Sequence, residues 1–257
     1  MKYETLILVS DKFIDFTADK KAITVSQLNA MLEIPEHILP GTMKLIPGLG
    51  LSDNDIEELT TKINAQRTQP HRWDISALAA RPRPAKSLLS HKRLAHNTLI
   101  GTPRKLEDDR FRLDICINEN SELMSDHQTG QHVQGMLLIE ASRQAFLAVT
   151  EAYFKLESEE NVYFVINSMK TEFMGFVFPL HSHIDYRIVS KDINERRQKF
   201  SVEIDIIQSG DLRTKCAISF TVYPNRIISE REAALAKDTV RVFLRQFHQP
   251  TSEIVAK

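Results

Sequence analysis

The chain has 257 residues, of which 42% are hydrophobic and 26% charged, and these proportions exclude a disordered protein. Its formal net charge of -1 excludes a chain-wide positive field that would attract nucleic acid or anionic lipid. No apolar run approaches the roughly 18 residues that a membrane span needs. The N-terminal apolar run lacks the cleavage-site pattern of a signal peptide, so we expect a cytoplasmic protein that binds neither membrane nor nucleic acid.

Residues 1–70 predict a small α/β unit. Thr5–Val9 has the composition of a strand, and Thr24 and Ser52 each precede a helical pattern as N-cap residues. The glycines of Pro47–Gly50 lack the Gly-Lys-Ser/Thr ending of a phosphate loop, so we do not assign one. Residues 70–90 are rich in proline and arginine and predict a linker, so the N-terminal extension with its linker is placed at residues 1–87.

Residues 91–225 predict a second unit of two strands, one long apolar helix and four further strands. The first two strands are expected at Asn97–Gly101 and Phe111–Ile117, with a hairpin turn at Glu107–Arg110 between them. The helix is expected from about Gly135 to about Lys155. The last four strands are expected at Val162–Ile166, Ile184–Val189, Phe200–Ile207 and Cys216–Val222. An amphipathic helix over residues 228–248, with Ser229 as its N-cap, completes the chain.

The long apolar helix carries two distinct faces. At about 100° per residue, Ala141, Ala145, Ala148 and Ala152 form a narrow small-residue stripe that lets the helix lie close to a sheet. Another face gathers Met136, Glu140, Arg143, Gln144 and Leu147. Polar groups inside a buried helix cost free energy unless they are paired or used. Their clustering near the start of the helix predicts a lined pocket.

The residues around the start of this helix suggest acid–base chemistry. His127 or His132, in the preceding polar loop, is suited to proton transfer near neutral pH, with Glu140 as the partner carboxylate. The free N–H groups at the helix start would stabilise an oxyanion, and Gly135 leaves room for a substrate carbonyl. Arg143 would either keep Glu140 ionised or bind a phosphate. The alternative is an ordinary i, i+3 ion pair beside structural histidines.

A longer motif surrounds these residues. Residues 131–144 have the sequence Gln-His-Val-Gln-Gly-Met-Leu-Leu-Ile-Glu-Ala-Ser-Arg-Gln, which resembles the A-factor biosynthesis (AfsA-like) hotdog family. The hallmark of that family is His-Val-Pro-Gly-Met followed by Glu-Ala-Ala-Arg-Gln. His91-Lys92 and the run Asn97–Arg104 also resemble the start of that domain, and the resemblance covers residues 88–225. Gln131 and Gln134 depart from the family, which often has an acidic residue and a proline there.

The resemblance implies an α+β hotdog fold, an antiparallel sheet wrapped around a central helix. The small N-terminal α/β extension would precede a hotdog domain at residues 88–226, and a C-terminal helix and tail would occupy residues 227–257. We find one hotdog unit where the A-factor enzymes carry two. Since hotdog sites form between two units, the resemblance implies a homodimer.

The resemblance also implies a function. The family transfers a β-ketoacyl group from an acyl carrier protein or coenzyme A thioester to the hydroxyl of dihydroxyacetone phosphate, which leads to butyrolactone signals of secondary metabolism. We therefore expect an acyltransferase on acyl-CoA or acyl carrier protein. Expected catalytic residues are Glu140, His132 and His127, and expected substrate-binding residues are Arg143, Gln144, Gly135 and Met136.

Several alternatives stay open at this point. A hotdog dehydratase would use a loop histidine, with His127 the nearest equivalent, and a thioesterase or a non-catalytic acyl-binding module would use the same fold. We expect no cofactor and no metal, because His181 and His183 share a strand face without a third ligand. Cys116 and Cys216 are expected to be reduced packing residues.

Overall fold

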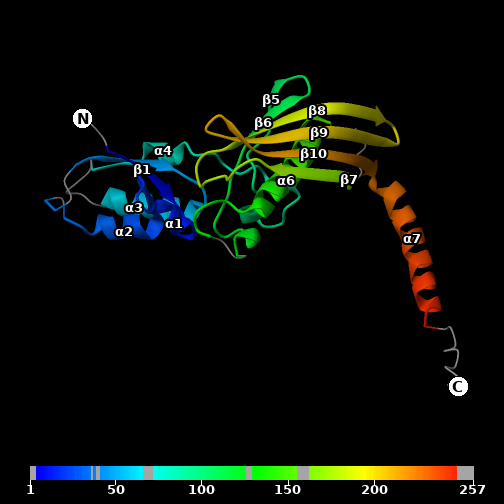
Figure 1. Ribbon diagram of the computed structural model, residues 1–257, viewed down its shortest axis with the longest axis horizontal. Helices are drawn as coiled ribbons and strands as arrows, with labels where there is room; N and C mark the ends of the chain where they lie inside the picture. Colours follow the sequence, from blue (N-terminus) through cyan, green and yellow to red (C-terminus); the bar gives the residue numbers. More distant parts are fainter. Residues whose placement is uncertain are drawn as a thin grey trace, which may run out of the picture.

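The computed structural model describes residues 4–35, 37–38, 41–65, 72–125, 129–154 and 162–247. An α/β unit, a sheet wrapped on a helix and a projecting C-terminal helix follow one another along the long axis of the molecule (Figure 1). None of the helices in these ranges has the length and hydrophobicity required to cross a bilayer.

The N-terminal unit is built on a parallel sheet in the order β2-β1-β3-β4. Its strands are β1 (Glu4–Val9), β2 (Ala22–Thr24), β3 (Met43–Pro47) and β4 (Trp73–Asp74). Its helical segments are η1 (Asp11–Phe13), α1 (Ile14–Thr17), α2 (Val25–Leu32), α3 (Asp53–Ala65) and α4 (Ser76–Ala79). Helices α2, α3 and α4 bury their apolar faces in a core with the sheet, in which Leu8, Leu28 and Leu45 are fully buried.

The two predicted N-caps of this unit are confirmed. Thr24 Oγ1 accepts from Gln27 N at 3.2 Å while the Gln27 side chain accepts from Thr24 N at 2.9 Å, which is a capping box. Ser52 and Asp55 make the same reciprocal bonds at the start of α3, at 3.1 and 2.8 Å. Each cap satisfies N–H groups that the helix leaves without partners.

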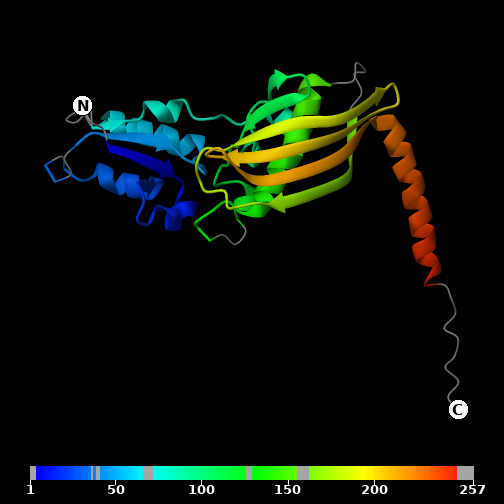
Figure 2. The ribbon, with the colours of Figure 1, turned by 45° about the horizontal axis from the view of Figure 1, so that its top comes forward.

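The second unit has the predicted hotdog architecture. Its antiparallel sheet has the order β5-β6-β8-β9-β10-β7 and curves around α6 (Figure 2). The strands are β5 (Arg104–Glu107), β6 (Arg110–Asp114), β7 (Val162–Phe173), β8 (His183–Asn194), β9 (Arg197–Gln208) and β10 (Asp211–Pro224). The helical segments are α5 (Ser87–Ser90), η2 (Ala95–Asn97), η3 (Glu122–Met124) and α6 (Gly135–Tyr153).

Helix α6 lies against the sheet through small and aromatic residues. Ala141, Ala145 and Ala148 of the predicted stripe are buried, whereas Ala152 at the end of the helix is exposed. Phe146 of α6 stacks on Phe220 of β10, with ring centroids 4.3 Å apart. The small residues permit the close approach and the rings fill the space beside them, as dense packing of a core requires.

Two sequence expectations are wrong. Asn97–Gly101 is not a strand: η2 ends at Asn97, and the extended residues beyond it make only isolated bridges, such as Ile100 to Ile115. The C-terminal helix begins three residues before 228, as α7 (Asn225–Arg245), with Pro224 at its N-cap. Ser229 therefore lies inside the helix and does not cap it. Its hydroxyl donates to Arg226 O, three residues earlier, at 3.2 Å, a bond that serines inside helices commonly make.

The two units dock through the loop after β3. Gly50 N donates to Ile117 O, and Leu49 N donates to Pro179 O, both at 3.0 Å. A Cβ at Gly48 would lie 2.6 Å from Pro179 O, and Gly50 has φ +92° with Ser10 Oγ 2.2 Å from its Cβ position. Gly48 thus permits close backbone contact between the units, and Gly50 permits close packing of the loop against Ser10 within the α/β unit. Val9, Phe13 and Leu49 also join the apolar core of the hotdog unit.

Helix α7 projects away from the body of the molecule (Figures 1 and 2). Ile228, at its base, is its one buried residue in the described part of the chain. The predicted apolar face is present but uncovered, because Val240, Val242, Phe243 and Phe247 are each more than half exposed. Most of the stability of a helix in a protein comes from packing of its apolar face, so packing against another surface would stabilise α7.

Candidate functional site

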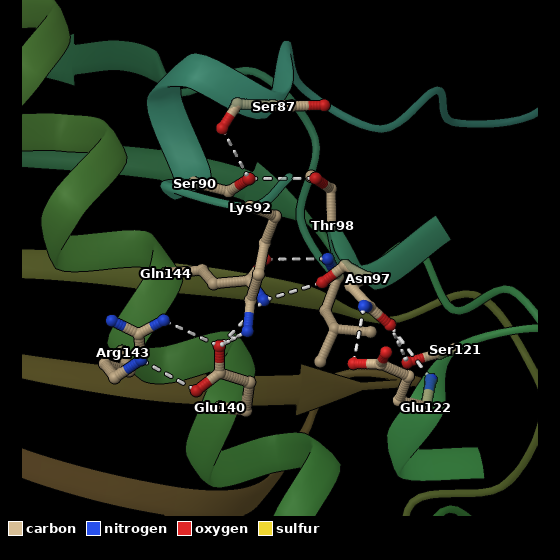
Figure 3. Close-up of polar contacts among 11 residues, drawn as sticks. Ser87, Ser90, Lys92, Asn97, Thr98, Ser121, Glu122, Glu140, Arg143 and Gln144 are labelled. Carbon is tan, nitrogen blue, oxygen red and sulfur yellow. Dashed lines mark hydrogen bonds and ion pairs between the residues drawn. The ribbon is translucent and has the colours of Figure 1, made fainter. Parts of the chain in front are cut away.

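Glu140 lies at the centre of a cluster of charged and amide groups on α6 (Figure 3). Arg143 Nε donates to Glu140 Oε2 at 2.7 Å and Arg143 Nη2 donates to Oε1 at 2.9 Å, a bidentate pair. Lys92 Nζ reaches Oε1 from the segment between α5 and η2, at 2.7 Å, and Gln144 Nε2 donates to the same oxygen at 3.0 Å. The Glu140 carboxylate is thus held by two cations and one amide.

The surroundings of Glu140 keep it ionised. Burial raises the pKa of the Glu140 carboxyl, but hydrogen bonds from Arg143, Lys92 and Gln144 outweigh burial and lower the pKa from 4.5 to about 2. The side chain of Glu140 is 17% exposed, against 24% for Lys92 and 31% for Arg143. The cationic groups therefore reach solvent more readily than the anion that holds them.

Gln144 connects this cluster to the backbone of the preceding segment. Its side chain is fully buried, its Oε1 accepts from Leu99 N at 2.8 Å and its Nε2 donates to Asn97 O at 2.9 Å. The Asn97 side chain in turn accepts from Glu122 N at 2.9 Å and donates to the Glu122 carboxylate at 3.0 Å. Gln144 satisfies backbone groups that would otherwise be buried without partners, and so fixes the position of residues 97–99.

Local backbone structure positions Lys92. The short helix α5 packs beside α6 and ends at Ser90, and its C-cap residue His91 has φ +55°. Lys92 N donates to Ser87 O at 3.1 Å, and the hydroxyl groups of Ser90 and Thr98 are 2.8 Å apart. This turn directs Lys92 toward Glu140 (Figure 3). The sequence did not predict Lys92 or Asn97 as members of the cluster.

His132 lies in a different place, in a groove beside the start of α6. Its ring contacts Phe176, with centroids 4.5 Å apart, and its Nδ1 is 3.2 Å from Thr129 Oγ1. The groove has a volume of about 420 Å³ and is mostly apolar. Its lining residues are His132, Val133, Gly135, Leu138, Phe173, Met174, Gly175, Phe176 and Val177. Glu140 does not line it, so within one chain the groove and the Glu140 cluster are separate.

The start of α6 is partly covered by the chain itself. A Cβ at Gly135 would lie 2.8 Å from the Phe173 ring, so this glycine permits the close packing of β7 on the helix. Gln134, the N-cap residue, donates its side-chain amide to Leu123 O and does not cap the helix. Met136 is 56% exposed and makes none of the hydrogen bonds of the Glu140 cluster. His127 lies outside the described residues.

The remaining candidate ligand residues form no metal site. His181 Nε2 is 3.1 Å from Asp114 Oδ1 and His183 Nε2 is 3.7 Å from Asp185 Oδ1. Across the ranges described above, no three histidine, cysteine or acidic side chains gather to hold a metal ion. Cys116 and Cys216 are free thiols, so they form no disulfide with each other. Burial raises the pKa of Cys116 to about 12, so Cys116 is not a reactive thiolate.

Comparison with known proteins gives a family and a set of related folds. Residues 73–224 match the family model of the A-factor biosynthesis hotdog domain, AfsA. The match begins at Trp73, before residue 88, where the sequence pattern placed the start of the hotdog domain, and therefore includes the linker. No curated protein matches the chain in sequence.

Among solved structures, a thioesterase mutant from Pseudomonas aeruginosa is 12% identical, with a TM-score of 0.39 over 52% of this chain and 89% of that one. A putative thioesterase from Shewanella oneidensis is 12% identical, with a TM-score of 0.36 over 49% and 83%. A thioesterase from Haemophilus influenzae is 13% identical, with a TM-score of 0.37 over 54% and 87%.

Proposed function

Because this chain belongs to the A-factor biosynthesis hotdog domain family, we propose that it is an acyltransferase that acts on acyl-CoA or acyl carrier protein. The acyl group passes to a small hydroxyl acceptor such as dihydroxyacetone phosphate. The family resemblance implies that this acyl group is a β-ketoacyl group. The observation that carries the proposal is the Glu140 cluster, in which the motif residue Glu140 binds both the motif residue Arg143 and Lys92.

In this proposal Lys92 and Arg143 bind the phosphate of the acceptor. Both side chains are cationic, partly exposed and fixed in place by Glu140. A guanidinium group binds phosphate bidentately and an ammonium group adds a point charge. Glu140, with a pKa of about 2, cannot supply a proton at neutral pH, so its role is that of the partner carboxylate that orients both cations.

His132 is the group assigned to proton transfer. The acceptor hydroxyl attacks the thioester carbonyl, the new C–O bond forms and the C–S bond breaks. The hydroxyl proton passes through His132 to the departing thiolate, which leaves as the thiol. The groove beside His132 has the volume of a small-molecule site and an apolar lining suited to an acyl chain. N–H groups at the start of α6 would stabilise the oxyanion.

A homodimer brings the two halves of the site together. Within one chain His132 and Glu140 serve separate surfaces, so we assign the His132 groove of one chain and the Glu140 cluster of another to the same site. Strand β7 offers the interface. In the described residues it pairs only with β10, and it exposes Tyr163, Ile166 and Phe173.

The opposite edge of the sheet is different. Strand β5 has four residues, three of them charged, which protects an edge from pairing, whereas β7 has twelve residues and would be prone to aggregation if it stayed uncovered.

Light scattering of purified Ile166→Lys should therefore detect monomers, and Leu106→Lys on β5 should remain dimeric. A dimer that survives Ile166→Lys and Leu106→Lys equally would exclude β7 as the interface.

The reaction is tested with a panel of acyl-CoA and β-ketoacyl-CoA substrates, with and without dihydroxyacetone phosphate. Thiol release that requires the acceptor supports acyl transfer. Acceptor-independent thiol release identifies a thioesterase, and a new enoyl absorbance without thiol release identifies a dehydratase. Either result would replace the proposal.

Variants test the assigned residues. Glu140→Ala, measured at a temperature where it is folded, and His132→Asn should each abolish turnover, whereas Lys105→Met, on the exposed β5, should not affect it. An equal mixture of Glu140→Ala and His132→Asn chains should regain activity, because every dimer that contains one chain of each kind holds one intact site. No recovery in a mixture shown to exchange subunits would contradict the shared site.

A non-catalytic acyl-binding module is the second candidate. The observation in its favour is that every Glu140 oxygen already accepts hydrogen bonds, which leaves no carboxylate atom poised for chemistry. Such a module would retain an acyl ligand in native mass spectrometry without turning it over.

A further inference from the structure

A cavity of about 260 Å³ lies where the α/β unit meets the hotdog unit. It is lined by Pro47–Leu49 after β3, by Ala80–Pro82 of the linker and by Ile115–Asn118 of the hotdog unit. Neither Glu140 nor His132 lines it, so it is separate from both parts of the proposed acyl site. The volume is close to the lower end of the range for small-molecule sites, about 300–1,000 Å³.

The topology of the parallel sheet favours a ligand at this position. The chain passes from β1 to β2 on one side and later to β3 on the other side of β1, so the strand order reverses between β1 and β3. In open parallel sheets, ligands bind outside the carboxyl ends of the strands at such a reversal. Strand β3 ends at Pro47, and the three residues Pro47–Leu49 form one wall of the cavity.

The charged groups at the cavity favour an anion. Arg81 lines the cavity with a side chain that is only 8% exposed, and it binds the Asp53 carboxylate, as does Arg83 at 2.6 Å. Asp53 also lines the cavity, and Arg83 binds it from outside the lining. Two guanidinium groups thus share one carboxylate, which leaves one positive charge in excess in this group. Burial and the positive charge of Arg83 lower the pKa of Arg81, as expected where cations outnumber anions.

The other walls are suited to an apolar body. Leu49, Leu51, Ile115 and Ile117 provide aliphatic surface, and His96 and His181 provide polar groups at the hotdog side. A cavity with mostly apolar walls and a few convergent polar groups is typical of a small-molecule site. The aliphatic walls would bind a short hydrocarbon chain while Arg81 binds its charged end.

We propose that this cavity binds a small anion with an apolar body, either a carboxylate or a phosphate monoester. The site is independent of the proposed acyl transfer and stands or falls separately. It also gives the α/β unit a function, because that unit contributes Asp53 and the wall after β3.

Calorimetric titration of the full chain tests the proposal with three probes that share one hydrocarbon chain: hexanoate, hexyl phosphate and 1-hexanol. Hexanoate or hexyl phosphate should bind at least about tenfold more tightly than hexanol. The tighter of the two anions identifies the head group. Absence of binding by all three at millimolar concentration, or equal binding of hexanol, would overturn the proposal.

A matched pair of variants locates the binding. Ala80→Trp places a large ring at the cavity wall, whereas Ala79→Trp places it one residue away on an exposed position that does not line the cavity. Ala80→Trp should weaken anion binding at least about tenfold and Ala79→Trp should leave it unchanged.

Arg81→Gln should remove the preference for anions, and His132→Asn should leave binding unaltered. Equal effects of the two tryptophans, or loss of binding in His132→Asn, would place the anion elsewhere and exclude this site.

Discussion

Glu140 and Asp53 are each paired with two cations, but the buried partner differs. In the Glu140 cluster the carboxylate is 17% exposed and its partners Lys92 and Arg143 reach solvent more readily. In the Asp53 pair the carboxylate is 70% exposed and one of its cations, Arg81, is only 8% exposed. The first cluster is a buried anion held by cations, and the second is a buried cation held by an anion.

The difference shows that burial of the carboxylate sets how much its charge contributes to stability. A buried carboxylate held by several donors loses strong interactions when its charge is removed, whereas the interactions of an exposed carboxylate are already weakened by water. At Glu140, the remaining cations would meet water and bind an incoming phosphate. At Asp53, the remaining Arg81 would stay inside the cavity wall. The two clusters should therefore respond differently to removal of their carboxylate charge.

The largest effect is expected for Glu140→Gln. The substitution keeps the volume of the side chain but removes the negative charge of the carboxylate, which accepts hydrogen bonds from Arg143, Lys92 and Gln144. The free energy of unfolding should therefore fall by about 3 kcal/mol. Chemical denaturation measures this loss. Glu151→Gln is the matched control, because Glu151 lies on the same helix and pairs only with His91 in the described contacts. Equal losses in the two variants would show that the cluster contributes no special stability.

Acid should have a similar effect without a mutation. The pKa of Glu140 is lowered from 4.5 to about 2, so the folded state favours the ionised form. The stabilisation, about 3 kcal/mol, is fully present above pH 4.5 and is lost as the pH falls through about 2. The stability difference between the native chain and Glu140→Gln should therefore shrink across this window. A constant difference down to pH 2 would contradict the lowered pKa.

Local patterns predicted the parts of the fold that depend on neighbours in sequence. The Thr24 and Ser52 caps, the alternation of Phe111 to Ile117 and the small stripe of α6 each reflect contacts within a few residues. The position of Glu140 and Arg143 on one helix turn followed in the same way. These features were predictable because helix and strand periodicity determine which side chains share a face.

Contacts between distant segments were not predictable in this way. Lys92 meets Glu140 only because α5 packs beside α6, and no spacing rule connects the two residues. Asn97–Gly101 has strand composition, yet Gln144 binds the backbone of Asn97 and Leu99 in place of a strand partner. Tertiary contacts therefore overrode a local preference, as β-propensity permits. The cavity at the unit boundary likewise requires three segments that only the fold brings together.

A smaller effect is expected for Asp53→Asn. The loss of the carboxylate leaves the buried Arg81 with Leu78 O, at 3.1 Å, as a remaining acceptor, and should cost about 1–2 kcal/mol. In the double variant Arg81→Met with Asp53→Asn, most of this loss should be recovered, because no buried charge remains. Thermal unfolding of the single and double variants measures the coupling. A double variant that is less stable than either single variant would show that Arg81 contributes through packing and not through charge.

The smallest effect is expected for Lys92→Met, at about 1 kcal/mol. The methionine keeps the apolar stem of Lys92 packed, and Arg143 and Gln144 still hold Glu140, so only one charged hydrogen bond is lost. Lys105→Met is the control, because Lys105 pairs with the exposed Asp108 and its replacement should leave the melting temperature unchanged. The comparison matters for function as well as stability. If Lys92→Met lost turnover while losing so little stability, its ammonium group would act on the substrate; if turnover stayed intact, Arg143 alone would bind the phosphate and the assignment of Lys92 would be wrong.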